Sequence, residues 1–253
     1  MADETQVTEA KSKLAKADFT IDFIDPLFAV AIHIGFVEGL LNEHWLHERV
    51  FPHTWADFAN LALFVSAFWT IVASWVGYHK SIQSKPIMGQ RRFVLDILLL
   101  ALYIFLLLYF RDPIAEAIIL AAIFTLYISW DFYKTVEYSD RYYNSAPVPS
   151  GLVFLSWCFA EWLQPGRHIH LRSEAITVGW TAFFFVLIPL ALLPLSGSDG
   201  GKFAFAAIFV LANTIYRYDK GSQGTWICSI PFKIFIAAII GYLVLYHTKV
   251  LCF

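Results

Sequence analysis

Ionisable side chains are concentrated in one otherwise apolar segment near the start of the chain, residues 19–41. Asp22, Asp25, His33 and Glu38 all lie there. Carboxylates and imidazoles are the groups that relay protons or meet cations inside a membrane. Because burying a charge in apolar surroundings is costly, each of these groups is a candidate either for function or for pairing with a partner.

Further polar residues fall near the ends of the next two apolar segments. Trp75 and His79 close residues 57–79, and Asp96 lies one turn into residues 93–110. Three consecutive helices that alternate in direction bring these ends to one face. We therefore expect a polar knot, flanked by Arg91 and Arg92. Its members are Asp22, Asp25, Trp75, His79 and Asp96.

Three interpretations of the polar knot are open. The first, which we favour, is structural: buried carboxylates paired with His or Arg hold three helices together. The second is a proton or cation relay. The third is that the side chains reach the membrane interface without a partner.

The first segment also has an apolar face. Val30, Ile34 and Val37 follow one another at helical spacing, and Asp25 points well away from them. Such a stripe commonly meets lipid or another helix. The sharper hypothesis is that it lines a narrow hydrophobic pore in an oligomer, where constriction and dewetting control ion flow.

The composition of the chain indicates an integral membrane protein. Of 253 residues, 58% are hydrophobic and 15% are charged, and the mean hydropathy is +0.61. A soluble domain has about 25% charged residues. The net charge of −2 provides no basic field for nucleic acid, so we expect no nucleic-acid partner.

Seven apolar segments are long enough to be membrane helices, each needing about 20 residues. They follow a polar tail, residues 1–18, which lacks the apolar core of a signal peptide. The predicted spans are 19–41, 57–79, 93–110, 113–133, 175–196, 202–217 and 226–248.

The charges between the spans predict the orientation of the chain. Most of the 18 lysine and arginine residues fall in the tail and in every second connection, which places the N-terminus in the cytoplasm. The inner loop 134–174 is the longest connection. Within it, Gly151–Leu163 is too short to span and reads as an interfacial or re-entrant helix.

The sequence offers little for enzyme or cofactor chemistry. Three scattered cysteines, Cys158, Cys228 and Cys252, form no paired motif. We find no nucleophile motif and no metal pair, and we expect no enzyme activity, no cofactor and no metal site. Lys233, in the last span, leaves a retinal-binding photoreceptor open as a minor alternative.

The string FIDPLFAVAI, residues 23–32, resembles the first-helix signature of the lysosomal-type potassium channels and their bacterial relatives. Trp75 and His79 are similar to that family's conserved positions in the second helix, and Asp96 falls where the family tends to carry Asn. The resemblance covers about the first 130 residues. The chain departs from the family at Phe19, where the family has Arg, and in seven spans rather than six.

The resemblance implies a homotetramer whose first helices line a pore for monovalent cations. Val30, Ile34 and Val37 would narrow that pore. Asp25, Trp75, His79 and Asp96 would pack the first three helices together.

We therefore expect an all-α bundle of six to seven transmembrane helices that acts as a potassium-like cation channel or leak pathway. Its expected partners are monovalent cations, the lipid bilayer and further copies of the chain. A membrane sensor or scaffold and a proton-coupled transporter stay open as alternatives.

Overall fold

The computed structural model describes residues 23–40, 54–85, 89–138, 150–163, 171–192 and 197–221, together with Pro52 and Ile87. Within these residues all regular structure is helical. A first helix over residues 23–34 continues as the π-helix η1 (Gly35–Leu40). The later helices are α3 (Trp55–Ser84), α4 (Gln90–Leu108), α5 (Pro113–Glu137), α7 (Gly151–Leu163), α8 (Arg172–Leu192) and α9 (Asp199–Gly221).

Local sequence explains where two of these helices begin. Thr54 caps α3: its hydroxyl accepts from the Asp57 amide, and the Asp57 carboxylate accepts from the Thr54 amide, both at 3.2 Å. Asp112 caps α5 in front of Pro113, whose missing amide hydrogen costs nothing in the first turn.

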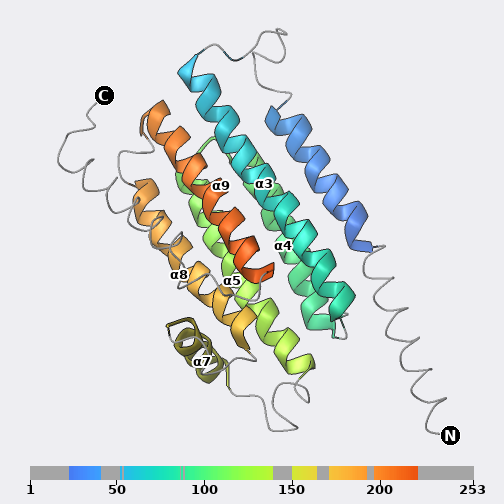
Figure 1. Cartoon of the computed structure of the whole chain (residues 1–253). Helices are drawn as coiled ribbons and strands as arrows, with labels where there is room; N and C mark the ends of the chain where they lie inside the picture. Colours follow the sequence, from blue (N-terminus) through green and yellow to red (C-terminus); the bar gives the residue numbers. More distant parts are fainter. Residues whose placement is uncertain are drawn as a thin grey trace, which may run out of the picture.

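The long helices run side by side and alternate in direction (Figure 1). The largest contact surfaces join α3 to α9 and α5 to α8, and α4 packs on α5. The first helix lies along α3 and α4, on the edge of the bundle (Figure 1). Consequently one end of the bundle holds the C-terminal ends of α3, α5 and α9 together with the N-terminal ends of α4 and α8.

The core of the bundle is apolar and aromatic. Ile24 and Phe28 of the first helix pack with Tyr103 and Leu107 of α4 in one cluster that extends to α9. Gly35 permits the closest approach: a Cβ atom there would lie 2.2 Å from the Leu107 Cδ1 atom. The first helix can therefore rest on α4 only because this position has no side chain.

Two of the described helices, α3 and α5, are long and apolar enough to cross a membrane. Large apolar side chains also face outward on other helices, for example Val94, Phe105 and Phe203. Several charged side chains lie inside, among them Arg92 and Asp131, which are at most 1% exposed. Charged side chains are almost never fully buried in a water-soluble protein unless they are paired.

Helices lie at the first six predicted segments, and the seventh, 226–248, is outside the described residues. Several helices extend beyond the predicted ends: α3 continues to Ser84 and α5 to Glu137. The inner loop 134–174 is consequently shorter than expected. Within it α7 covers the predicted short helix, Gly151–Leu163, and packs on α8.

Candidate functional site at one end of the bundle

Asp25 bridges the first helix and α3. Its Oδ1 atom accepts a hydrogen bond from Trp75 Nε1 at 3.0 Å and lies 2.7 Å from His79 Nε2. Trp75 and His79 are one helical turn apart, so both reach the same carboxylate. The Asp25 side chain is 35% exposed and that of His79 is 23% exposed. The pair is therefore half-buried, whereas the interpretation favoured from the sequence predicts a buried carboxylate at Asp25.

Asp96 takes different partners from those expected. It accepts from Tyr78 Oη at 3.3 Å and from Trp130 Nε1 at 3.0 Å. Among the described residues it makes no hydrogen bond to Asp25 or His79. The residues of the expected polar knot thus form two clusters, one around Asp25 and one around Asp96, which are connected through the neighbouring residues Tyr78 and His79 on α3. Asp22, the remaining member, lies outside the described residues.

Arg92 joins α4 to α5 instead of balancing Asp25. Its guanidinium donates to Glu137 Oε2 at 2.7 Å and to the Lys85 carbonyl at 3.3 Å, and its centre lies 4.2 Å from the centroid of the Trp130 ring. The Arg92 side chain is fully buried. A buried guanidinium that contacts a carboxylate and an aromatic face indicates a structural role.

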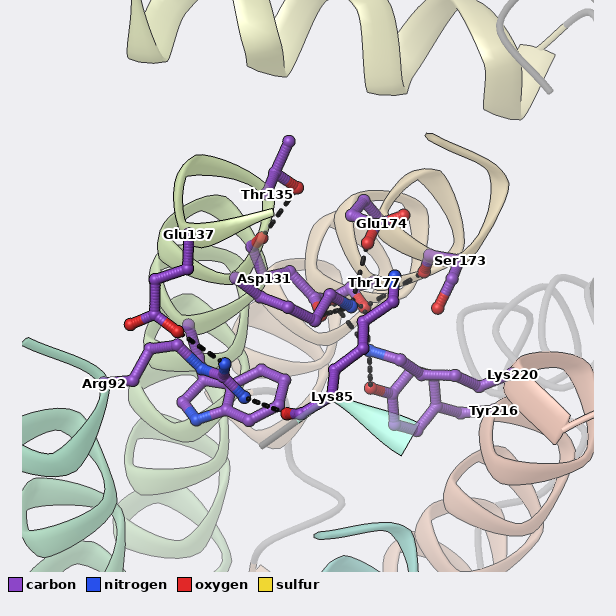
Figure 2. A network of polar contacts seen from close by, with 12 residues as sticks. Lys85, Arg92, Asp131, Thr135, Glu137, Ser173, Glu174, Thr177, Tyr216 and Lys220 are labelled. Atoms are coloured by element: carbon purple, nitrogen blue, oxygen red, sulfur yellow. Dashed lines mark hydrogen bonds and ion pairs between the residues drawn. The ribbon is translucent and has the colours of Figure 1, made fainter. Parts of the chain in front are cut away.

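Asp131 is the centre of a buried network that joins α5, α8 and α9 (Figure 2). Its two oxygens lie 2.8 Å from Lys134 Nζ and 2.8 Å from Lys220 Nζ. The Thr177 hydroxyl donates to Asp131 at 2.6 Å, and Lys134 also pairs with Glu174 at 2.8 Å. Two lysines and two carboxylates therefore balance each other in charge.

Lys220 stays charged in this network. Burial lowers the pKa of its ammonium group, but the adjacent Asp131 carboxylate outweighs burial, so the pKa is raised. Its Nζ also donates to the Thr177 hydroxyl at 2.7 Å.

Arg217, one turn before Lys220 on α9, is held by hydroxyl groups. It donates to Ser74 Oγ at 2.8 Å and to Tyr127 Oη at 3.0 Å, and Tyr127 Oη is 2.6 Å from Tyr103 Oη. Gly77 of α3 makes room for it, because a Cβ atom there would lie 2.3 Å from Arg217 Nη1. No carboxylate pairs with Arg217 among the described residues.

Arg217 and the residues of the Asp131 network lie in the wall of a cavity of about 920 Å³. Its walls are formed by Phe28, α3, α4, α5, the start of α8 and the end of α9. Its charged lining residues are Lys80, Lys85, Lys134, Arg172, Arg217 and Lys220, against Asp96, Asp131 and Glu174. Cavities of this size, with a few convergent polar groups, are typical of small-molecule sites.

The predicted stripe of the first helix lies on the outside of the bundle. Val30 is 50% exposed, and Ile34 and Val37 are half-buried. The opposite face, with Ile24, Phe28 and Ala31, is buried against α3 and α4. Within a single chain the described residues therefore leave Val30 exposed and cover Ile34 and Val37 only in part.

Apart from Asp96, the charged residues that line the cavity are not among the site residues expected from the sequence. Asp131 and Lys134 are three residues apart on one helix, as are Arg217 and Lys220. That spacing puts each pair on one helix face, and the predicted topology puts both pairs on the same side of the membrane. The sequence signal for the cavity is therefore this spacing on α5 and α9 and not the first helix.

Among the described residues no group of three or more His, Cys, Asp and Glu side chains is placed to hold a metal ion. Comparison of the chain with family models, with curated proteins and with solved structures finds no match in any of the three.

Proposed function

We propose that this protein is an integral membrane bundle of six to seven helices in which copies of the first helix line a path for monovalent cations. Membrane insertion is supported by the two long apolar helices, α3 and α5, and by the distribution of side chains. Apolar side chains on the outside match lipid, and the charged groups of the Asp131 network are paired with one another inside the bundle.

The observation that carries the channel proposal is the partly exposed apolar stripe of the first helix, Val30, Ile34 and Val37. Val30 is 50% exposed, while Asp25 is turned aside and held by Trp75 and His79. The first helix is thus anchored by its polar side and presents its apolar side to whatever lies next to the bundle. Four such stripes around one axis form a hydrophobic constriction that loses water easily.

The test is potassium flux into liposomes containing the purified protein. Val30→Asn and Ile34→Asn should wet the constriction and raise flux about tenfold, because a polar side chain removes the dewetting barrier. Ala31→Asn is the matched control: Ala31 is fully buried, so the same change should impair folding rather than widen a pore.

If the stripe faces lipid, the first two variants should reduce membrane insertion and leave flux unaltered. Absence of flux from the wild type and from both stripe variants would remove the channel proposal.

A membrane sensor is the second candidate, and the observation that favours it is the cavity of about 920 Å³ at one end of the bundle. A cavity within one chain needs no second copy. A ligand bound there would change the packing of α3, α4, α5, α8 and α9, the helices whose side chains line the cavity.

A further inference from the structure

The cavity at this end of the bundle carries more positive than negative lining residues. Six lysine and arginine side chains face three carboxylates. Lys134 and Lys220 are already matched by Glu174 and Asp131, and Asp96 is held by Tyr78 and Trp130. Arg217 pairs with no carboxylate among the described residues, so its positive charge in the cavity wall attracts an anion.

Arg217 is the cation best placed to meet such an anion. Its described partners are neutral: the hydroxyls of Ser74 and Tyr127 and the ring of Tyr216, whose centroid is 5.1 Å from the guanidinium carbon. Its Nε atom is buried and makes no hydrogen bond. Guanidinium presents a planar set of donors that fits phosphate in a bidentate manner.

The part of the cavity that follows α3 from Gly77 back toward Trp69 is apolar and aromatic. Trp69, Val72 and Val76 line it, and Trp69 lies about 12 Å along the helix from Gly77 at the rise of 1.5 Å per residue. Trp69 is 39% exposed and Val76 is 57% exposed. The apolar part of the cavity therefore continues to the outer surface of the bundle, where our proposed function places lipid.

We infer that this cavity binds an anionic lipid, with the phosphate headgroup at Arg217 and an acyl chain leaving past Trp69 and Val76. A free phosphate ion would satisfy Arg217 alone and leave the apolar half of the cavity without a ligand. The inference rests on the membrane location proposed above and does not depend on conduction.

Binding is measured on the full chain in detergent by native mass spectrometry, with dioleoyl phosphatidic acid, dioleoyl phosphatidylcholine and inorganic phosphate as probes. We expect phosphatidic acid to bind at least about tenfold more tightly than phosphatidylcholine, and Arg217→Gln to remove about tenfold of that affinity. Arg111→Gln is the matched control, since it removes one positive charge at the opposite end of the bundle.

Gly77→Ala provides a second variant that keeps every charge. The added methyl group must displace the Arg217 guanidinium, so phosphatidic acid should again bind several-fold more weakly. If Arg217→Gln fails to fold, the binding of phosphatidic acid by Gly77→Ala tests the proposed site.

Three results would overturn the inference. One is equal binding of the two lipids by the wild type. Another is unchanged binding of phosphatidic acid by Arg217→Gln or, if that variant fails to fold, by Gly77→Ala. The third is competition by inorganic phosphate at the same concentration as the lipid, which would identify a simple anion site. Because binding is measured without flux, a failed channel proposal and a failed lipid site give different results.

Discussion

Three carboxylates of this bundle have different surroundings, and the surroundings decide what each carboxylate contributes to the stability of the protein. Asp131 meets two ammonium groups and a hydroxyl. Asp25 meets an indole and an imidazole and keeps contact with solvent. Glu116 meets only the hydroxyl of Ser66 among the described residues. The same substitution, acid to amide, should therefore have three different effects.

Asp131→Asn should destabilise the protein strongly. The amide leaves Lys134 and Lys220 with one counterion fewer in a buried place, and breaking a buried pair costs about 3–5 kcal/mol. Asp25→Asn is the matched control and should cost about 1 kcal/mol or less, since its partly exposed pair is screened. Thermal unfolding in detergent measures both. Equal losses in the two variants would show that the Asp131 network is hydrated.

Glu116→Gln should leave stability unchanged or raise it by about 1 kcal/mol. Glu116 is fully buried, its Oε2 atom has no hydrogen bond, and no cation faces it among the described residues. Glutamine keeps a hydrogen bond with Ser66 and carries no charge that burial would penalise. A clear fall in unfolding temperature would contradict this account and would indicate a cation or proton site at Glu116.

At the scale of elements, two contacts position the first helix, one near each of its ends. Most of its partners are on α3 and α4, and its π-helical part, η1, touches α4 at Gly35 and Leu107. Because the polar anchor at Asp25 lies near the other end of this helix, the two contacts together fix both ends against the bundle.

Gly35→Ala should destabilise this packing by about 1–3 kcal/mol, as overpacking of a tight core does. In a free helix the same change would stabilise, since alanine is the better helix former. Leu107→Ala in the Gly35→Ala background should restore part of the loss, because it removes the atoms that the new methyl group meets. A double-mutant cycle from thermal unfolding measures the coupling; additive losses would place Gly35 away from Leu107.

At the scale of the whole molecule, the charged network lies toward one end of the bundle. The end of α3 and the start of α4 lie at the end opposite the start of α9 (Figure 1). The Asp131 network joins the last turns of α5 and α9 to the start of α8. Positive charge at one end is the pattern expected of a membrane protein whose charged end faces the cytoplasm.

Cysteine substitutions at the two ends should react from opposite sides of the membrane. Gln83 is exposed in the last turn of α3, and Gly200 has open space around an added Cβ atom. In intact cells an impermeant maleimide should label Gly200→Cys and should label Gln83→Cys only after permeabilisation, with the modified peptide identified by mass spectrometry. Labelling of both in intact cells would overturn the proposed topology.

The sequence alone predicted much of the fold, for a physical reason. Helix positions follow from runs of apolar residues and from local caps such as Thr54 and Asp112, and both signals are contained within a few turns of chain. The short helix Gly151–Leu163 was visible for the same reason. Contact of Asp25 with Trp75 and His79 was also expected, since it joins two consecutive segments.

The tertiary structure alone decided which charges meet. Asp131 pairs with Lys220, which lies 89 residues later in the chain, because α9 returns beside α3 and α5 rather than at the edge of the bundle. Asp96 turns to Trp130 and Arg92 to Glu137 because α4 packs on α5. Charge pairing depends on which helices are neighbours, and neighbours are chosen by the fit of whole helix surfaces, which hydropathy and spacing along one helix do not encode.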